Sequence, residues 1–305
     1  MILVCGIPSE TPLAMVTDAL AAEGLAHRVF NQRRAGDVRL SMSVESGRIA
    51  GQLDLYGERI SLSDVTGVYV RTMDDQSLPE LATEPPDGAL RRHVRGLHDA
   101  LYRWAELAPA TVINRAGPQG SNASKIYQAQ LITRHGFKTP HTLVTNQPDA
   151  ARAFAALHEK VIFKSMSGVR SIVRTLDDDD LARLERIRWC PVQFQALVPG
   201  VDVRVHVVGE ALFATRVDSD VTDYRYARRQ GGEARLTAVE LPTSLAARCV
   251  ALTRGLGLEL AGIDLKITPD GEVYCFEVNP SPAFSYFEAN TGQPIARAIA
   301  RRLAG

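Results

Sequence analysis

The chain has 305 residues, enough for about two domains of ordinary size, and 45% of them are hydrophobic and 23% charged. This globular composition excludes a disordered or collagen-like chain. Basic and acidic residues number 35 each, so the formal net charge is zero and predicts no electrostatic affinity for nucleic acid or an anionic membrane surface.

The cysteines and the N-terminal segment indicate the cellular compartment. Cys5, Cys190, Cys249 and Cys275 are far apart in the sequence and form no zinc or redox motif, which favours a reduced, cytoplasmic setting. The N-terminal apolar run lacks a basic region and is broken after Ile7 by Pro-Ser-Glu. It therefore predicts neither a signal peptide nor a membrane span.

The first third of the chain predicts an α/β opening followed by short strands. A strand, a helix and a strand are expected at 2–7, 11–23 and 27–31. Short strands separated by Ser-Gly and Gly-Glu turns are expected within 41–71. Three prolines in 72–92 predict a loop or a mobile segment, and an amphipathic helix is expected over 88–107.

The rest of the chain mixes helices with strands. Strands are expected at 111–114, 142–145, 161–164, 192–198, 202–208, 211–218, 259–268 and 272–278, and helices at 123–135, 148–158, 178–187, 243–256 and 293–303. The acidic run Asp177–Asp180 is typical of a helix start, where negative charge is favourable. Residues 219–235 are polar, contain Gly231 and Gly232, and predict a long loop.

The most informative segment is AGIDLKITPDGEVYCFEVNPSP, residues 261–282. Asp270-Gly271 between two alternating runs predicts a β-hairpin with a two-residue turn. This register pairs Thr268 with Val273, Lys266 with Cys275, and Asp264 with Glu277. Strand alternation then places the following residues on the core face: Ile263, Leu265, Ile267, Tyr274, Phe276 and Val278.

Asp264, Glu277 and Asn279 are expected together on the other face of this hairpin. Directly opposed carboxylates repel each other, so their pairing favours a bound cation. Oxygen ligands of this kind suit Mg²⁺, which binds one or two carboxylates together with substrate phosphates; Mn²⁺ is the alternative. A solvent-exposed acidic patch is the competing interpretation, and the apolar surroundings and the following Asn-Pro-Ser-Pro disfavour it.

Two lysines are candidate phosphate ligands. Lys164 ends an apolar strand and precedes the small residues Ser-Met-Ser-Gly, whose backbone N–H groups suit an anion. Lys125 opens a helix after another run of small residues. Taken alone, the Lys164 pattern is a weak signal, since many strands end in lysine, and Lys125 would be an ordinary surface lysine.

Charged residues also alternate along the strand at 202–208. Asp202, Arg204 and His206 share a face, where a carboxylate suits ribose hydroxyls and an arginine suits phosphate; His206 is better interpreted as a satisfied polar residue than as a catalytic base. Arg216 lies on the next strand. A strict two-residue turn at Gly209-Glu210 would place Arg216 on the face opposite Arg204, whereas a longer turn or a bulge would bring them together.

These pieces, in this order, resemble the ATP-grasp superfamily, and within it the ribosomal-modification-type carboxylate–amine ligases and the ligases that cyclise graspetide (microviridin-type) precursor peptides. The resemblance is good over 111–300 and looser in the N-terminal strands. It implies an α/β (α+β) ATP-grasp fold, with a pre-ATP-grasp domain at 1–110 and two α+β subdomains, 111–191 and 192–305, that clamp ATP.

The resemblance also implies a role for each candidate residue. The nucleotide-binding residues would be Lys125, Lys164, the hinge strand Gln195, Ala196, Leu197 and Val198, and Asp202 at the ribose. Arg204 and Arg216 would hold the γ-phosphate and an acyl phosphate, and Asp264, Glu277 and Asn279 would hold the metal. Substrate contacts would come from Tyr224 and Arg225 in the loop 219–235, which is either a mobile cover or a plain connection, and from Ser281.

The implied activity is an ADP-forming ligation. A carboxylate would attack the γ-phosphate of ATP, and an amine or a hydroxyl would then displace phosphate from the acyl phosphate. The substrate is either a ribosomal peptide or a free amino acid or small peptide; a basic groove at Arg33 and Arg34 would favour the former. A carboxylate or hydroxyl kinase and a non-catalytic nucleotide-binding protein are further alternatives, and relatives of this type are often homo-oligomers.

Overall fold

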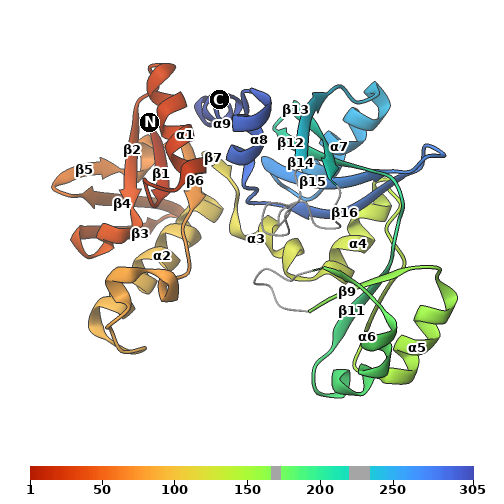
Figure 1. Ribbon diagram of the computed structural model, residues 1–305. Helices are drawn as coiled ribbons and strands as arrows, with labels where there is room; N and C mark the ends of the chain where they lie inside the picture. The colour runs from red at the N-terminus through yellow and green to blue at the C-terminus, as the bar shows by residue number, and fades with distance from the viewer. Residues whose placement is uncertain (166–172, 220–233) are drawn as a thin grey trace.

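The computed structural model describes residues 1–165, 173–219 and 234–305. Figure 1 shows three lobes: an N-terminal one in red and orange, a central one in yellow-green, and a C-terminal one in blue. Each lobe contains both helices and sheet, which confirms the predicted α/β (α+β) class. None of the helices among the described residues is long and apolar enough to span a membrane.

The N-terminal lobe is built on a parallel sheet in the order β2-β1-β6-β7. Its strands are β1 (Ile2–Gly6), β2 (His27–Asn31), β6 (Gly67–Arg71) and β7 (Thr111–Ile113). One face, which includes Leu3 and Val68, packs on helix α2 (Ala89–Leu107). The other face, which includes Val4 and Tyr69, packs on α1 (Thr11–Ala22) and on two C-terminal helices. Burial of both faces explains why β1, inside the sheet, is continuously apolar, whereas the edge strand β2 is not.

A second, antiparallel sheet, β3-β4-β5, joins the N-terminal lobe. It consists of β3 (Val38–Glu45), β4 (Arg48–Leu55) and β5 (Glu58–Ser61), as the turn signals in the sequence predicted. Short 3-10 helices flank these elements at η1 (Gln32–Asp37), η2 (Leu62–Asp64), η3 (Asp75–Ser77) and η4 (Pro79–Leu81).

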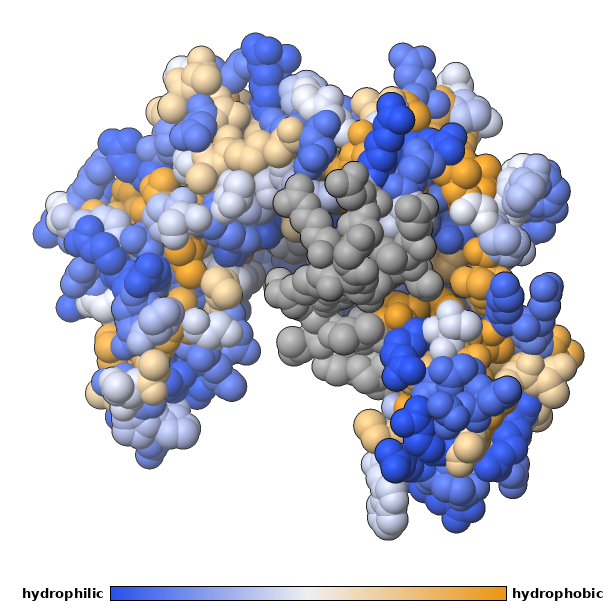
Figure 2. All heavy atoms as spheres, in the orientation of Figure 1, coloured by the Kyte–Doolittle hydropathy of each residue, from blue (hydrophilic) through white to orange (hydrophobic). Residues whose placement is uncertain are grey.

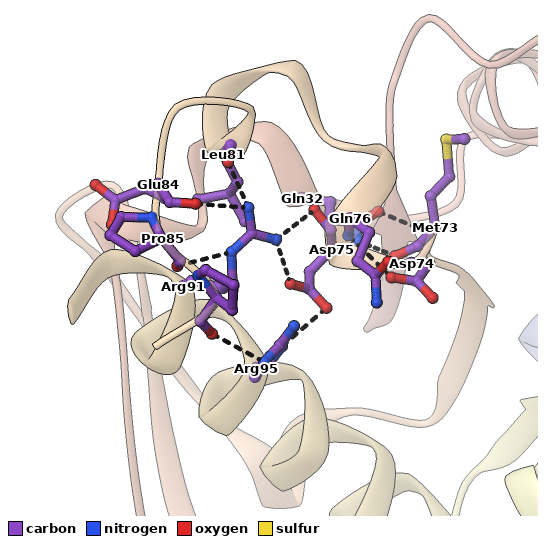
Figure 3. A network of polar contacts seen from close by, with 11 residues as sticks. Gln32, Met73, Asp74, Asp75, Gln76, Leu81, Glu84, Pro85, Arg91 and Arg95 are labelled. Atoms are coloured by element: carbon purple, nitrogen blue, oxygen red, sulfur yellow. Dashed lines mark hydrogen bonds and ion pairs between the residues drawn. The ribbon is translucent and has the colours of Figure 1, made fainter. Parts of the chain in front are cut away.

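The proline-rich stretch 72–92, predicted to be a loop or a mobile segment, passes at residue 89 into α2, and one buried arginine of that helix holds the part before it (Figure 3). Arg91 on α2 donates to the carbonyls of Leu81, Glu84 (3.2 Å) and Pro85 (3.3 Å). It also pairs with Asp75 at 2.8 Å, and Arg95 pairs with the other oxygen of Asp75 at 3.0 Å. Sequence patterning could not reveal this order, because Arg91 binds mainly backbone carbonyls, which every residue carries.

The central lobe contains an antiparallel sheet in the order β10-β9-β11-β8. Its strands are β8 (Thr142–Thr145), β9 (Val161–Ser165), β10 (Arg174–Thr175) and β11 (Val192–Ala196). Its helices are α5 (Pro148–Leu157), α6 (Asp178–Ala182) and η6 (Leu184–Trp189). Before it come α3 (Ala116–Gln119), η5 (Gly120–Ala123) and α4 (Lys125–Arg134), and α4 packs on β16 and the C-terminal core through Ile132. Asp177 caps α6 by accepting from the Asp180 N–H at 2.7 Å, so the acidic run does begin a helix.

The C-terminal lobe is an antiparallel sheet in the order β14-β13-β12-β15-β16. Its strands are β12 (Val201–Val208), β13 (Ala211–Ser219), β14 (Ala234–Val239), β15 (Leu260–Ile267) and β16 (Val273–Asn279). Helix α7 (Thr243–Gly255) covers one face, and α8 (Phe284–Thr291) and α9 (Ile295–Ala304) pack between the sheet and the N-terminal lobe. Sequence reasoning missed β14 and α8, which have no clear periodicity of their own.

The predicted domain boundaries, 110/111 and 191/192, each fall just before a strand that still belongs to the preceding sheet. Strand β7 pairs with β6 of the N-terminal sheet, and β11 pairs with β8 and β9 of the central sheet. The space-filling view is hollowed between the N-terminal and central lobes (Figure 2).

Candidate nucleotide and metal site

The β15–β16 hairpin brings the two predicted metal carboxylates together. Asp264 lies directly opposite Glu277, and Asn279, two residues further along β16, lies opposite Gly262. Because side chains alternate along a strand, Glu277 and Asn279 are on the same face as Asp264. The predicted Asp264–Glu277 pairing is therefore confirmed.

The register nearer the turn was predicted wrongly. Lys266 pairs with Tyr274 and Ile267 with Val273, and the connection is longer than the two residues Asp270 and Gly271. A bulge between Asp264 and Leu265 in the ladder leaves Phe276 unpaired, and this extra residue compensates for the longer connection.

The bulge also changes which residues of β16 face the core. Cys275 and Val278 are fully buried, together with Ile263 and Leu265 of β15. Tyr274 and Phe276, predicted on that face, are only partly buried. Burial raises the pKa of the Cys275 thiol, so this cysteine is a core residue rather than a nucleophile.

Each carboxylate is matched by a cation. Arg204 on β12 pairs with Asp264, with 2.5 Å between Nη1 and Oδ1, and only 8% of the Arg204 side chain is exposed. Lys125, at the start of α4, pairs with Glu277 and also donates to Asn122 Oδ1 at 3.0 Å. Helix α4 thus brings the first predicted nucleotide lysine to the predicted metal ligands.

Gly262 makes room for the Arg204 guanidinium. A Cβ atom on Gly262 would lie 2.6 Å from Arg204 Cζ and 2.7 Å from Pro282 Cβ, far inside van der Waals contact. Arg204 Nε also faces His206 Nε2 at 3.5 Å. Burial, with a further contribution from Arg204, lowers the pKa of His206 well below its usual value, so His206 is neutral and does not act as a base at neutral pH.

Two buried amides that the sequence analysis did not single out hold the end of β16. Gln128 on α4 exchanges two hydrogen bonds with the backbone of Val278, at 2.8 and 3.0 Å. Asn114, directly after β7, donates to the carbonyls of Pro280 (2.6 Å) and Leu260 (2.7 Å). In the sequence, a role for Asn114 was indicated only by its position, as a polar residue at the carboxyl end of a buried strand.

The predicted nucleotide residues of the central lobe share one face of its sheet. Lys164 on β9 lies opposite Gln193, and Gln195 lies opposite Ile162 and Thr142. The other face, which carries Phe163 and Phe194, packs on the core of the lobe. Lys164 and Gln195 therefore lie on the face away from that core.

The backbone of the predicted hinge strand is already partly engaged. The Ala196 N–H donates to His141 O and the Leu197 N–H to Lys160 O, both at 2.9 Å, and Val198 is buried. An adenine ring that used these two N–H groups would have to compete for them.

The structure does not bring Arg216 together with Arg204. The turn at Gly209-Glu210 has two residues, since Val208 pairs with Ala211. Arg216 consequently lies opposite Val203, on the other face of the sheet, and it pairs with Asp218 at 2.8 Å. On the face of Arg204, Asp202 pairs with Lys266 at 3.1 Å.

The predicted substrate residues divide into two groups. Ser281 follows β16, and its hydroxyl accepts from Arg71 Nη1 at 3.1 Å. Tyr224, Arg225 and most of the loop 219–235 lie outside the described residues, as do Met166, Ser167 and Gly168 of the small-residue turn predicted after Lys164.

The chemistry of the donor set fits a Mg²⁺ ion. Within residues 1–165, 173–219 and 234–305, no group of three or more His, Cys, Asp or Glu side chains is arranged to hold a metal. Two facing carboxylates and an amide oxygen remain, and Mg²⁺ typically uses one or two carboxylates and completes its shell with phosphate oxygens and water. The residues present therefore suit a metal that arrives with a nucleotide.

Comparison with known families decides the identity of the fold. The model of the RimK-like ATP-grasp domain matches residues 122–303, well over half of the chain. The chain belongs to the RimK-like ATP-grasp family. The matched region of this ATP-grasp protein starts just before Lys125 and includes β15, β16 and both carboxylates.

Solved structures extend the likeness over the whole RimK-like chain. The ATP-grasp ligase PsnB complexed with minimal precursor is 28% identical, with a TM-score of 0.81 over 99% of this chain and 97% of that one. A Chryseobacterium gregarium RiPP-associated ATP-grasp ligase, in complex with ADP and a leader and core peptide, has a TM-score of 0.83 at 23% identity, over 99% and 96% of the chains. At that identity the second match shows the fold alone.

Curated relatives cover less of this ATP-grasp chain. A probable alpha-L-glutamate ligase of Parasynechococcus marenigrum is 27% identical over 65% of this chain and 44% of its own length, so the chain spans less than half of that relative. Another, from Pseudoalteromonas atlantica, is 27% identical over 66% of this chain and 69% of its own length. The predicted family and fold are confirmed, and the relatives are ligases by name, as the predicted enzyme class requires.

Proposed function

We propose that this protein is an ADP-forming ligase that activates a carboxylate of a ribosomal precursor peptide as an acyl phosphate and joins it to an amine or a hydroxyl. The extent of the likeness supports a peptide substrate. PsnB, solved with a minimal precursor, matches 99% of this chain, including the N-terminal lobe.

Arg204 is the residue best placed to stabilise the transferred phosphoryl group. It is almost fully buried and is held by Asp264 across the sheet, so its charge is fixed in direction before a substrate arrives. Phosphoryl transfer depends mainly on positioning and on neutralising charge, and a pre-oriented cation provides both. Arg216 faces the other way, so its assignment to the same phosphoryl group has no support from the geometry.

Asp264, Glu277 and Asn279 are proposed to hold Mg²⁺, which when bound would neutralise phosphate charge in the site. Lys125 is proposed to contact phosphate. Its ammonium group is already at the Glu277 carboxylate, so it is close to where phosphate oxygens would meet the metal ligands.

Lys164, the hinge residues Gln195 to Val198, and Asp202 are proposed to bind the nucleoside end of ATP. Lys164 and Gln195 share the face of the central sheet that does not pack on the core of the lobe. Asp202 is neutralised by Lys266, so a ribose hydroxyl would join an existing ion pair.

Two other functions remain as alternatives. The names of the curated relatives favour a ligase that acts on free glutamate or a small peptide. The arginines expected to form a basic peptide groove do not favour either substrate, since Arg33 pairs with Glu80 at 2.5 Å and Arg34 with Asp37 at 3.2 Å. A carboxylate or hydroxyl kinase of the same fold would use the same ATP site without the ligation step.

The test is ADP release combined with mass spectrometry. The protein is incubated with ATP and Mg²⁺ and either a short precursor-like peptide encoded beside it or free amino acids. Peptide ligation predicts ADP formation with the loss of one water from the peptide for each bond formed. A peptide that gains phosphate instead would indicate a kinase, and ADP release only with free glutamate would refute the peptide substrate.

A further inference from the structure

Arg71 ends strand β6 of the N-terminal sheet and is largely buried, with 10% of its side chain exposed. Its Nε atom donates to both oxygens of Glu10 at 3.1 Å, and its Nη2 atom lies 2.6 Å from Oε1 of the same carboxylate. Glu10 immediately precedes helix α1. This two-pronged ion pair fixes the orientation of the planar guanidinium and leaves Nη1 directed elsewhere.

The Nη1 atom of Arg71 reaches the C-terminal lobe, 210 residues further along the chain. It donates to the Ser281 hydroxyl at 3.1 Å and to the Pro282 carbonyl at 3.2 Å. The Ser281 N–H in turn donates to Oδ1 of Asn279 at 2.9 Å. Arg71 is thus connected through a single residue to the side chain of a proposed metal ligand.

The segment Asn279–Pro282 receives a second support from the same sheet. Asn114 follows β7, the strand that pairs with β6, and donates to the Pro280 carbonyl at 2.6 Å. The carboxyl ends of two neighbouring parallel strands therefore hold the backbone that carries Asn279. Ligands of parallel sheets commonly bind at this edge, whereas here two side chains at the edge hold a segment of another lobe.

Only an arginine can make this set of contacts. The guanidinium uses one side of its fork for Glu10 and the remaining nitrogen for Ser281 and Pro282. A lysine has one ammonium group and would keep the charge but not the fork. The exposed pair Arg28–Glu58 in the same lobe, at 2.7 Å with about half of each side chain exposed, is a suitable control because Arg28 donates to Glu58 and His27, both in the N-terminal lobe.

We propose that Arg71 is a positioning residue for the ligase: it holds Asn279 in place through Ser281 and Pro282, so that the N-terminal lobe supports the metal end of the site. This rests on the proposed function. Residues that orient a metal ligand without touching the metal typically contribute about 10–100-fold to metal affinity. Loss of Arg71 should weaken metal binding and leave the nucleoside contacts intact.

The experiment measures binding without turnover. Mn²⁺ affinity is measured by electron paramagnetic resonance in the presence of ADP, and ADP affinity without metal by calorimetry. The proteins are the wild type, Arg71→Ala, Arg71→Lys and the control Arg28→Ala. We expect Mn²⁺ to bind about 10–100-fold more weakly to both Arg71 variants, with metal-free ADP affinity and the Arg28→Ala protein unchanged.

The outcomes separate this proposal from the function on which it rests. If the wild type binds no Mn²⁺ with ADP, the proposed function fails, and the positioning role fails with it. If the wild type binds both and Arg71→Lys, checked for cooperative unfolding, keeps wild-type Mn²⁺ affinity, only the positioning role is refuted. Should Arg71→Ala not fold, Arg71→Lys and Ser281→Ala decide, because Ser281→Ala removes the hydroxyl acceptor and leaves the Glu10 pair intact.

Discussion

Replacing Gly262 with alanine tests whether the buried orientation of Arg204 matters. Gly262 lies on β15 directly opposite His206 and Asn279. An added methyl group would lie 2.6 Å from Arg204 Cζ and 2.7 Å from Pro282 Cβ. Either the guanidinium leaves Asp264 or the segment after β16 moves.

The expected effects differ between stability and activity. Inserting one methyl group into a well-packed interior costs about 1–3 kcal/mol, which the fold should survive. Loss of a pre-oriented group that stabilises transition-state charge costs about 100–1,000-fold in kcat. We therefore expect a folded Gly262→Ala protein whose ADP release is at least about 100-fold slower.

Gly96→Ala is the matched control. Gly96 is exposed on helix α2, and nothing lies within 4 Å of an added Cβ atom. Alanine at an open helical position should raise the free energy of unfolding by about 0.5–1 kcal/mol and leave activity unchanged. Urea unfolding and an ADP-release assay measure both quantities; wild-type ADP release by Gly262→Ala would refute the role assigned to Arg204.

Three further substitutions test separate parts of the structure. Glu277→Gln should reduce Mg²⁺-dependent ADP release by at least about 100-fold, because a direct metal ligand should matter at least as much as a residue that only orients one. Wild-type release would contradict the metal role of Glu277. Arg91→Ala should lower the free energy of unfolding by about 1–3 kcal/mol, because it removes the donor to the carbonyls of Leu81, Glu84 and Pro85 while Arg95 still pairs with Asp75; an unchanged urea midpoint would contradict this. Because the pKa of His206 is lowered, the unfolded chain binds a proton that the native chain does not. Stability should therefore fall below about pH 6.5 by up to ~1.4 kcal/mol per pH unit, and His206→Gln should reduce this slope in unfolding curves measured across pH.

The sequence predicted the parts of the site that depend on local rules. Strand alternation acts over a few residues and placed Asp264 and Glu277 on one face; the assumed two-residue turn paired them correctly because the bulge offsets the longer connection. The same rules failed for the residues between Asp264 and the turn, where the bulge at Phe276 and the longer connection after Ile267 shift the register. A bulge has no reliable signature in a single sequence, so its effect on the core face of β16 was not predictable.

The supporting contacts were missed for a different reason. Asn114 and Gln128 bind backbone groups that lie more than a hundred residues away, and Arg71 binds a segment 210 residues away. A backbone acceptor can belong to any residue, so the sequence holds no complementary partner to find. Lys125 was identified only through the family resemblance, since the residues around it do not distinguish it from a surface lysine.

Helix α9 returns the end of the chain to its beginning. Ile295, Ile299 and Leu303 are fully buried in a core shared with β1 and α1, and the Leu303 carbonyl occupies the space that a side chain on Gly67 would need. The central lobe has its own small core around Phe154 and Phe194. On heating, the N-terminal and C-terminal lobes should unfold as one cooperative unit and the central lobe as another. Deletion of the last turn of α9 should destabilise β1.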